Sequence, residues 1–159
     1  MLIGVMSDSH DHQDKLKKAV ESFNARGVGI VIHAGDFIAP FSLKCLEALS
    51  CPWIGVFGNC DGERKGLTLK SEGRIQEPPY ELNLGGKSIY VTHNLDDAPD
   101  GRVPGRDVVI YGHTHEPAVA LKEKQLYVNP GELCAVLTGK STVAVIDTEA
   151  MTAEVVEIQ

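Results

Sequence analysis

The stretch VVIYGHTH, residues 108–115, is an apolar run that turns on Gly112 and directly afterwards presents His113 and His115. A histidine pair with this spacing is more often part of a polar loop than a pair of metal ligands. The stretch gains meaning because the same arrangement, an apolar run followed at once by polar side chains, recurs along the chain. These recurring strand ends determine both the predicted fold class and the predicted site.

Four further apolar runs end in the same way, with Asp, Asn or His directly after the run or one residue beyond it. The runs are LIGVM, followed by Asp8 and His10; IVIHAG, followed by Asp36; WIGVFG, followed by Asn59 and Asp61; and SIYVT, followed by His93. In an open parallel sheet, the crevice outside the carboxyl ends of the strands is where binding sites form. The sequence therefore predicts that these side chains converge at one edge of a sheet.

The first half of the chain alternates strands with helices. Residues 12–27 place apolar side chains at helical spacing and stop at Gly27. A second helix is predicted from Pro40, with Phe41, Cys45 and Leu49, together with Ala48, on its buried side. This β-α-β-α-β order favours a parallel sheet with helices on its faces.

The second half is rich in strands. The runs YELNL and KSIYVTH flank Gly85-Gly86 and predict a hairpin on a two-residue turn, and two further strand pairs are expected at 118–129 and 141–159. A second or mixed sheet packed against the first is expected. Residues 62–79 are the least periodic stretch and are predicted to lie on the surface, with at most one short helix.

Length and composition limit the function classes. The 159 residues fit one domain, predicted to span residues 1–159, and no apolar run approaches the roughly 18 residues that cross a bilayer. The net charge of −7, without a basic cluster, argues against bulk nucleic-acid binding. The N-terminus is not a secretory signal, and four cysteines without CxxC spacing indicate reduced thiols in a cytoplasm. Neither a membrane partner nor an extracytoplasmic location is expected.

Each polar residue has a structural alternative when it is taken singly. Asp8 and Asp36 could cap helices, Asn59 could be a turn residue beside glycine, and His93 could be a histidine satisfied by hydrogen bonds. Five strand ends that all carry such residues are hard to attribute to caps and turns, so the set favours a site. The glycines that precede three of these residues are expected to allow tight turns or close backbone approach.

The set contains more donors than one zinc ion takes, because it holds two carboxylates, four imidazoles and one amide. It suits two divalent ions that share a bridging carboxylate. Nitrogen and oxygen donors without a thiolate point to Mn, Fe, Zn, Ni or Co. The other histidines are set apart: His33 lies inside a strand and is predicted to pack, whereas His12 is expected at the surface or beside the site.

With these motifs in place, the chain resembles the calcineurin-like metallophosphoesterases, whose pattern is D-x-H, G-D, G-N-x-D, a single H, and G-H-x-H. The stretch VNPGE, residues 128–132, also resembles small bacterial and archaeal members. The resemblance is to the small single-domain branch that includes YfcE-type phosphodiesterases and the retromer scaffold subunit Vps29. It implies a four-layer α/β/β/α sandwich of two mixed sheets flanked by helices. It also implies the metal ligands: Asp8, His10 and His115 on the first ion, Asn59, His93 and His113 on the second, and Asp36 bridging both.

The resemblance implies a divalent-metal-dependent phosphodiesterase or phosphatase that acts on a small phosphate ester. Two ions, with manganese favoured over nickel, zinc, iron or cobalt, would activate a metal-bound hydroxide as the nucleophile. Many larger members carry a histidine where this chain has Cys60, and a thiol is a poorer acid for the leaving group. Asn59 and Asp61 are the expected catalytic residues, with Asp61 orienting a metal-bound imidazole, and Asn59, Cys60 and Asn94 the expected substrate contacts.

The connection after His93 is a further departure. Related small enzymes often continue His-Gly-His and then a helix, whereas this chain has a short polar connection over residues 94–106. The two stretches 62–79 and 94–106 are expected to form the rim of the site. The alternative function is a catalytically weak binding scaffold of the same fold, which an exposed apolar patch would support. Self-association is compatible with either function.

Overall fold

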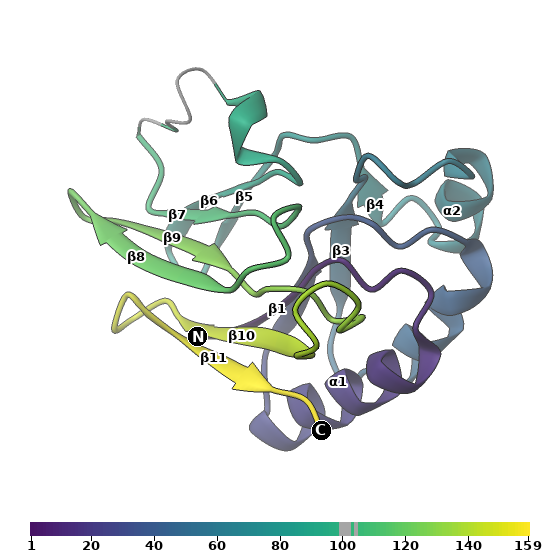
Figure 1. The fold of residues 1–159 in the computed structure, drawn as a ribbon. Coiled ribbons are helices and arrows are strands. Elements are labelled where there is room, and N and C mark those ends of the chain that lie inside the picture. The colour runs from purple at the N-terminus through teal and green to yellow at the C-terminus, as the bar shows by residue number, and fades with distance from the viewer. Residues whose placement is uncertain (99–102, 104) are drawn as a thin grey trace.

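The computed structural model describes residues 1–98, 103 and 105–159, and it contains two β-sheets packed face to face (Figure 1). The first sheet has six strands in the order β11-β10-β1-β2-β3-β4. They are β1 (Leu2–Met6), β2 (Ile30–His33), β3 (Trp53–Val56), β4 (Ile75–Gln76), β10 (Thr142–Asp147) and β11 (Thr152–Glu157). The strands β1 to β4 are parallel, whereas β10 and β11 add an antiparallel edge.

The second sheet has five strands in the order β5-β6-β7-β9-β8. They are β5 (Tyr80–Leu84), β6 (Lys87–Val91), β7 (Val108–Ile110), β8 (Ala118–Lys122) and β9 (Gln125–Asn129). Its three central strands are parallel, and antiparallel β5 and β8 close its two edges. The predicted hairpin is confirmed: Gly85 and Gly86 both have positive φ, 57° and 75°, as a type I′ turn requires.

Three helices cover the outer face of the first sheet (Figure 1): α1 (Gln13–Arg26), the 3-10 helix η1 (Pro40–Ala48) and α2 (Arg64–Lys70). The predicted α1 is confirmed, with Leu16, Ala19, Val20 and Phe23 buried and Gly27 as a left-handed C-cap. The helix α2 is the short one expected within residues 62–79.

The buried face of η1 differs from the prediction. Leu43 and Leu46 are buried together with Cys45, whereas Phe41 is 56% exposed and Ala48 is also exposed. The difference follows from the helix type, because a 3-10 helix has three residues per turn and stacks positions i and i+3. The predicted buried face assumes the α-helical spacing of 3.6 residues per turn.

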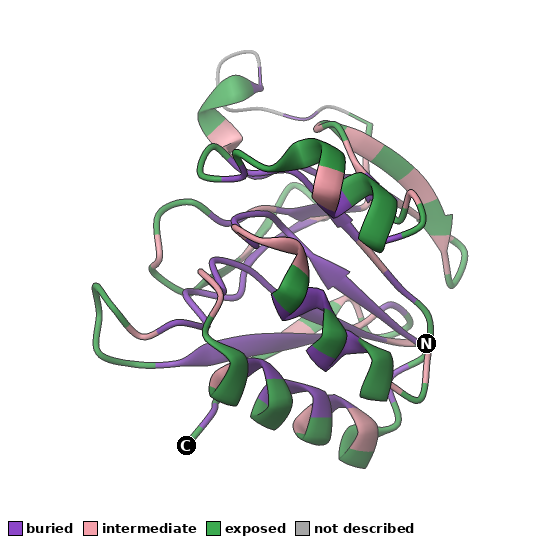
Figure 2. Ribbon diagram, turned by 90° about the vertical axis from the view of Figure 1, so that its right-hand side faces the viewer, coloured by how far each residue is buried: buried purple, intermediate pink, exposed green. Residues whose placement is uncertain are grey.

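Buried apolar side chains fill three layers. In Figure 2 the strands in the middle of the molecule are largely purple, the colour of buried residues. One layer lies between the helices and the first sheet, and one between the two sheets, where Ile3 and Val5 of β1 join Ile110 and Val128 of the second sheet. On the far side of the second sheet, the described residues show only the 3-10 helix η2 (Leu95–Asp97), Ala98 and Val103 against Tyr90 and Tyr127. The two mixed sheets flanked by helices are confirmed, but this fourth layer is thin, because a short connection leaves little room for a helix.

Candidate metal centre

All seven predicted ligands follow strand ends at one edge of the two sheets. Asp8 and His10 follow β1, Asp36 follows β2, and Asn59 follows β3; His93 follows β6, and His113 and His115 follow β7. Because β1 to β3 are parallel to one another, and β6 is parallel to β7, each sheet delivers its polar residues at the carboxyl ends of its strands. The side chains from the two sheets meet across this edge.

Helix capping, the alternative for the two aspartates, is not what the structure shows. His12 is the N-cap of α1 and Ala39 the N-cap of η1, and neither helix has a side-chain cap hydrogen bond. Asp8 and Asp36 instead accept hydrogen bonds from loop amides, those of His113 and Cys60. Both carboxylates are therefore directed toward the site.

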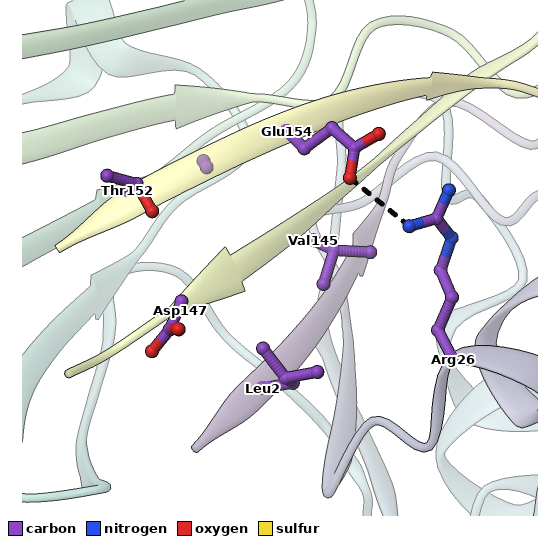
Figure 3. Close-up of a pocket in the computed structure, with 7 residues that line it drawn as sticks. Leu2, Arg26, Val145, Asp147, Thr152 and Glu154 are labelled. Carbon is purple, nitrogen blue, oxygen red and sulfur yellow. Dashed lines mark hydrogen bonds and ion pairs between the residues drawn. The ribbon is translucent and has the colours of Figure 1, made fainter. Parts of the chain in front are cut away.

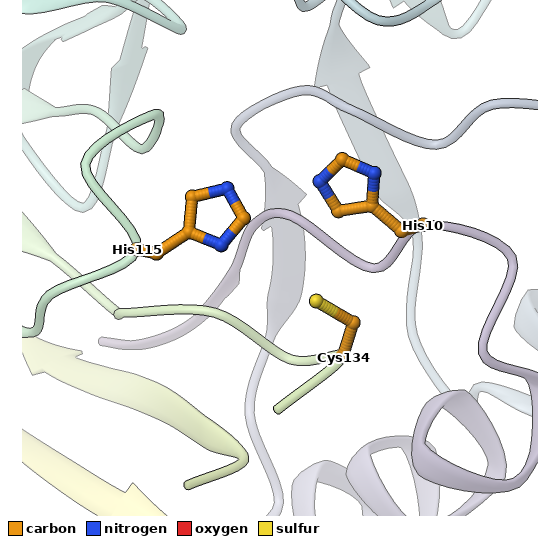
Figure 4. Close-up of side chains that lie close together, drawn as sticks. All are labelled: His10, His115 and Cys134. Atoms are coloured by element: carbon orange, nitrogen blue, oxygen red, sulfur yellow. The ribbon is translucent and has the colours of Figure 1, made fainter. Parts of the chain in front are cut away.

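The first group of side chains consists of Asp8, His10 and His115. Asp8 is fully buried, and its Oδ1 lies 3.3 Å from Nε2 of His115. The rings of His10 and His115 are stacked, with centroids 5.4 Å apart. Figure 4 draws these two side chains next to each other. These three residues are the ones that the family resemblance assigns to the first ion.

The second group consists of Asn59, His93 and His113. The amide oxygen of Asn59 lies 3.0 Å from Nε2 of His93 and 2.9 Å from Nδ1 of His113. Nδ1 of His93 lies 2.8 Å from the carbonyl oxygen of Ala34, which can only accept, so that nitrogen carries the proton. Nε2 of His93 is thereby left to face the site.

Asp36 lies between the two groups. Its Oδ2 is 3.6 Å from Nε2 of His10, in the first group, and its Oδ1 is 3.5 Å from Nε2 of His93, in the second. Burial would raise the pKa of Asp36, but hydrogen bonds and charge from His93 and the Cys60 amide outweigh burial and hold that pKa below its ordinary value. Asp36 is therefore an anion with one oxygen toward each group.

The arrangement calls for a cation. In neutral His93, Nε2 is an acceptor that faces two other acceptors, Asn59 Oδ1 and Asp36 Oδ1, and such a contact is favourable only with a proton or a metal ion between them. Burial lowers the pKa of His93, but Asp36 outweighs burial and raises it. Among the described residues, Asp8 Oδ1 and His10 Nε2 are also buried without a hydrogen-bond partner. Buried nitrogen and oxygen atoms without a hydrogen-bond partner are suited to coordinate a divalent metal ion.

The backbone of the site is strained. Asp8, His10, Asp36, His113 and His115 have φ between 41° and 67°, in the left-handed region that non-glycine residues seldom adopt. Each such residue costs on the order of 1 kcal/mol or more and persists only where the surrounding structure imposes it. Strain concentrated at five of seven predicted ligands fits a site selected for function.

Two of the glycines that precede ligands are required by close packing. A Cβ on Gly58 would lie 2.1 Å from Asp36 Oδ1, and a Cβ on Gly112 would lie 1.9 Å from Ser7 Oγ and 2.8 Å from Asp8 Oδ2. Neither position has room for a side chain. These glycines therefore let the backbone approach the two aspartates, as the sequence predicted.

Asp61 does not orient an imidazole, which corrects the expectation from its motif. Its buried carboxylate accepts hydrogen bonds from the backbone amides of Asp36, Ile38 and Gly58, at 3.1, 2.8 and 2.7 Å. Asp61 therefore ties the turn after β3 to the turn after β2. The hydrogen bond from the Asp36 amide to Asp61 holds the backbone of Asp36 in place.

Two expected substrate contacts have other partners in the structure. Asn94 is the N-cap of η2, and its side-chain oxygen accepts from the Asp96 amide at 3.0 Å, as the turn alternative requires. Cys60 is exposed beside Asn59, whose amide group lies 3.3 Å from its sulfur. Partial burial and the neighbouring Asp36 raise the pKa of Cys60 to about 11, so the thiol is neutral. Part of the predicted rim over residues 94–106 lies outside the described residues.

Sequence reasoning missed Glu132 and Cys134. Glu132 is fully buried, and its Oε2 lies 2.8 Å from Nδ1 of His115. The thiol of Cys134 donates to Oε2 at 3.2 Å and lies close to His10 and His115, as Figure 4 shows. The sequence contains a signal for Glu132. This residue comes three positions after the end of β9, beyond a Pro-Gly turn, and is therefore another polar residue that follows a strand end.

His33 and His12, the two histidines outside the predicted ligand set, lie as predicted. His33 is fully buried, stacks on Phe37 with ring centroids 3.7 Å apart, and contacts Ser9 Oγ at 2.9 Å. Burial lowers the pKa of His33 to about 3, so the ring is neutral. His12 is exposed at the start of α1.

A separate surface pocket lies at the other end of β1, between that strand, β10, β11 and the end of α1 (Figure 3). Arg26 and Glu154, which line it, are already paired at 3.2 Å. None of the predicted ligands lines this pocket. In the described part of the chain, no helix is long and apolar enough to cross a membrane.

Comparisons with known proteins place the chain in a family. Residues 1–151 match the model of the calcineurin-like phosphoesterase superfamily domain. Phosphodiesterase MJ0936 of Methanocaldococcus jannaschii is 40% identical over 158 residues, which cover 94% of each chain. A probable metallophosphoesterase of Methanothermobacter thermautotrophicus is 33% identical and covers 98% of this chain and 92% of its own length.

Solved structures show the same fold. A structure described as a novel archaeal phosphodiesterase superposes with a TM-score of 0.90 at 37% identity and covers 99% of each chain. Vps29 of Entamoeba histolytica, at 16% identity, superposes with a TM-score of 0.71 over all of both chains and shows the fold alone. The five motifs, the two-sheet fold and these matches agree: the chain belongs to the calcineurin-like phosphoesterase superfamily.

Proposed function

We propose that this protein is a metal-dependent phosphodiesterase whose seven strand-end ligands hold two divalent ions. The observation that carries the proposal is the position of Asp36, which presents one oxygen to His10 and the other to His93. A carboxylate so placed between two donor groups suits a ligand shared by two ions. Phosphodiesterase MJ0936 and the archaeal phosphodiesterase of known structure support the activity.

Two ions held by these residues would supply Lewis-acid charge and would make water a stronger nucleophile near neutral pH. The chain's own residues set the geometry for this chemistry. Asp8, His10 and His115 define one position, and Asn59, His93 and His113 the other, with Asp36 between them. Nitrogen and oxygen donors fit manganese, nickel, zinc, iron or cobalt, and of these we propose manganese as the metal.

The net charge of the chain does not oppose an anionic substrate at this site. The described ligands contribute only two carboxylates, so two divalent ions would leave the centre positive although the whole chain carries −7. A phosphate ester would be drawn to that local charge. We therefore propose a small phosphate ester as the substrate, with no role for bulk nucleic acid.

Cys60 is proposed to limit the range of substrates. Its thiol has a pKa of about 11, raised by burial and by Asp36, and it stands where many larger members carry a histidine. A neutral thiol is a poor proton donor to a leaving alkoxide, so esters with good leaving groups are expected to react fastest. Asn59 would contribute to substrate binding indirectly, because it belongs to the second group and would help to hold the ion that contacts the substrate.

A binding scaffold is the second candidate. This candidate is supported by β8 and β11, which are edge strands of the two sheets and expose Val119, Leu121 and Val155. Exposed apolar side chains of this kind suit a protein partner, or another copy of the chain. The complete ligand set favours the enzyme, because a scaffold has no need of strained ligands around a buried anion.

The test is hydrolysis of bis(p-nitrophenyl) phosphate and p-nitrophenyl phosphate by the Mn²⁺-loaded protein. Asp36→Ala and His113→Ala should lose most of the turnover, whereas His12→Ala, an exposed histidine outside the site, should keep it. Diester turnover above monoester turnover is expected, and chelation should abolish both. Turnover that survives Asp36→Ala, or no turnover with Mn²⁺, Ni²⁺ or Zn²⁺, would contradict the proposal.

We also propose that residues 1–159 act as one domain in the cytoplasm. All four cysteines are free thiols, which fits a reducing compartment. Cell fractionation with an antibody against the native protein tests the location. Recovery in a secreted or periplasmic fraction would contradict it.

A further inference from the structure

The carboxylate of Glu132 contacts both the loop that follows it and His115. Oε1 accepts from the backbone amides of Leu137 and Thr138 and, at 2.7 Å, from the Thr138 hydroxyl. Oε2 accepts from Nδ1 of His115 at 2.8 Å, from the Cys134 thiol at 3.2 Å, and from the amides of Val136 and Leu137 at 3.1 Å each. Oε2 therefore holds the imidazole of a predicted ligand and is itself held in place by the loop.

Glu132 is fully buried, and hydrogen-bond donors surround its carboxylate. The donors are the His115 ring, the Cys134 thiol, the backbone amides of Val136, Leu137 and Thr138, and the Thr138 hydroxyl. A buried carboxylate with this many donors is held in one orientation. The imidazole that contacts it is therefore fixed as well.

The backbone around Glu132 is tied to the same part of the site. The Glu132 amide donates to the carbonyl of His115 at 3.1 Å, and the Cys134 amide donates to the carbonyl of Asp8 at 3.1 Å. Residues 132–134 thus support the backbones of two of the three residues in the first group. A surface loop without a role at the site would not need these contacts.

We propose that Glu132 is a positioning residue that fixes His115 in the tautomer with Nε2 directed at the first metal position. A carboxylate that accepts from Nδ1 leaves Nε2 unprotonated, with its lone pair free to bind a metal ion, and Nε2 is the atom that lies 3.3 Å from Asp8 Oδ1. The Cys134 thiol donates to the same Glu132 oxygen. This inference rests on the proposed function, because it assigns Glu132 a role toward the first ion.

Glu132→Gln tests the inference, because either orientation of the amide disturbs His115. An oxygen facing Nδ1 keeps the hydrogen bond without the charge, whereas an NH₂ group facing Nδ1 favours the tautomer with Nε2 protonated. Loss of such a partner weakens metal affinity by about 10- to 100-fold. We expect this loss at one of two zinc sites when Zn²⁺ is titrated in competition with a chromophoric chelator.

Thr138→Val is the matched control. It removes a donor from Oε1 and loosens the loop while it leaves Oε2 and His115 in contact. Both zinc affinities should stay within about threefold of wild type in this variant. In a His115→Ala background, Glu132→Gln should cause no further loss, because it acts through that imidazole.

A second measurement needs no variant. In zinc-loaded protein with ¹⁵N-labelled histidine, His115 should show a protonated Nδ1 and a metal-bound Nε2 in its nitrogen shifts. Metal at Nδ1, unchanged zinc affinity in folded Glu132→Gln, or an equal loss in the His115→Ala background would each overturn the inference while the two-ion proposal stood. Failure of wild type to bind zinc would overturn both.

Discussion

Replacing Asp61 by asparagine distinguishes a structural tie from a catalytic group. In the structure the buried carboxylate receives three backbone amides: Asp36 and Gly58 share Oδ2, and Ile38 uses Oδ1. An asparagine oxygen at the Oδ2 position keeps two of these hydrogen bonds. Its NH₂ group then faces the Ile38 amide, donor against donor.

The expected loss follows from these contacts. A hydrogen bond to a charged group contributes about 1.5–3 kcal/mol, and a buried donor left without a partner costs about 1–3 kcal/mol. Asp61→Asn leaves the Ile38 amide without a partner, at about 1–3 kcal/mol, and weakens the two other hydrogen bonds because their acceptor is no longer charged. We therefore expect the free energy of unfolding of the metal-free protein to fall by about 2–4 kcal/mol.

Urea unfolding at neutral pH measures this loss. Asp14→Asn is the control, because it removes the same charge from a side chain that is 82% exposed. Asp14 lies in the first turn of α1 and pairs with Lys17, so its loss should lower stability by about 1 kcal/mol or less. A drop in turnover without a loss of stability in Asp61→Asn would refute the reasoning and give Asp61 a direct part in the chemistry.

Three further substitutions test other parts of the account. Gly58→Ala would place a Cβ 2.1 Å from Asp36 Oδ1 and should lower phosphodiesterase turnover about 100-fold. A Cβ at Gly62 meets nothing within 4 Å, so Gly62→Ala should keep the wild-type turnover. Equal turnover in the two variants would contradict the packing argument. Burial lowers the pKa of His33 to about 3, so the unfolded chain binds a proton that the folded chain does not. Stability should therefore fall as pH drops below about 6.5, by up to about 1.4 kcal/mol per pH unit, and urea unfolding of His33→Gln should show less of this slope. An unchanged slope would count against a neutral buried ring. Cys60→His should raise hydrolysis of esters with poor leaving groups at least about tenfold, and no gain would remove the leaving-group argument.

Much of the fold could be predicted from the sequence, because its strands and α1 follow simple periodicities. The two-residue turn at Gly85-Gly86 and the C-cap at Gly27 are local signals that need no tertiary information. The buried face of η1 could not be predicted in this way, since its 3-10 spacing becomes evident only when Leu43 and Leu46 pack on the sheet. The strand β4 has only two residues and leaves no periodic pattern.

The predicted ligands come together because each follows a strand end, which is a property that the sequence displays. The supporting contacts are less visible. Asp61 belongs to a motif that suggested chemistry, but the direction of three backbone amides decides its hydrogen bonds. Glu132 lies beyond a Pro-Gly turn, and only the fold brings it to His115.

The central claim is that Asp36 joins two metal positions. Electron paramagnetic resonance of the protein titrated with Mn²⁺ tests this most directly, because two ions that share a ligand are magnetically coupled. We predict two Mn²⁺ per chain with a spin-coupled signal that Asp36→Ala abolishes. A single isolated Mn²⁺ signal at saturation, or coupling that persists in Asp36→Ala, would contradict the account.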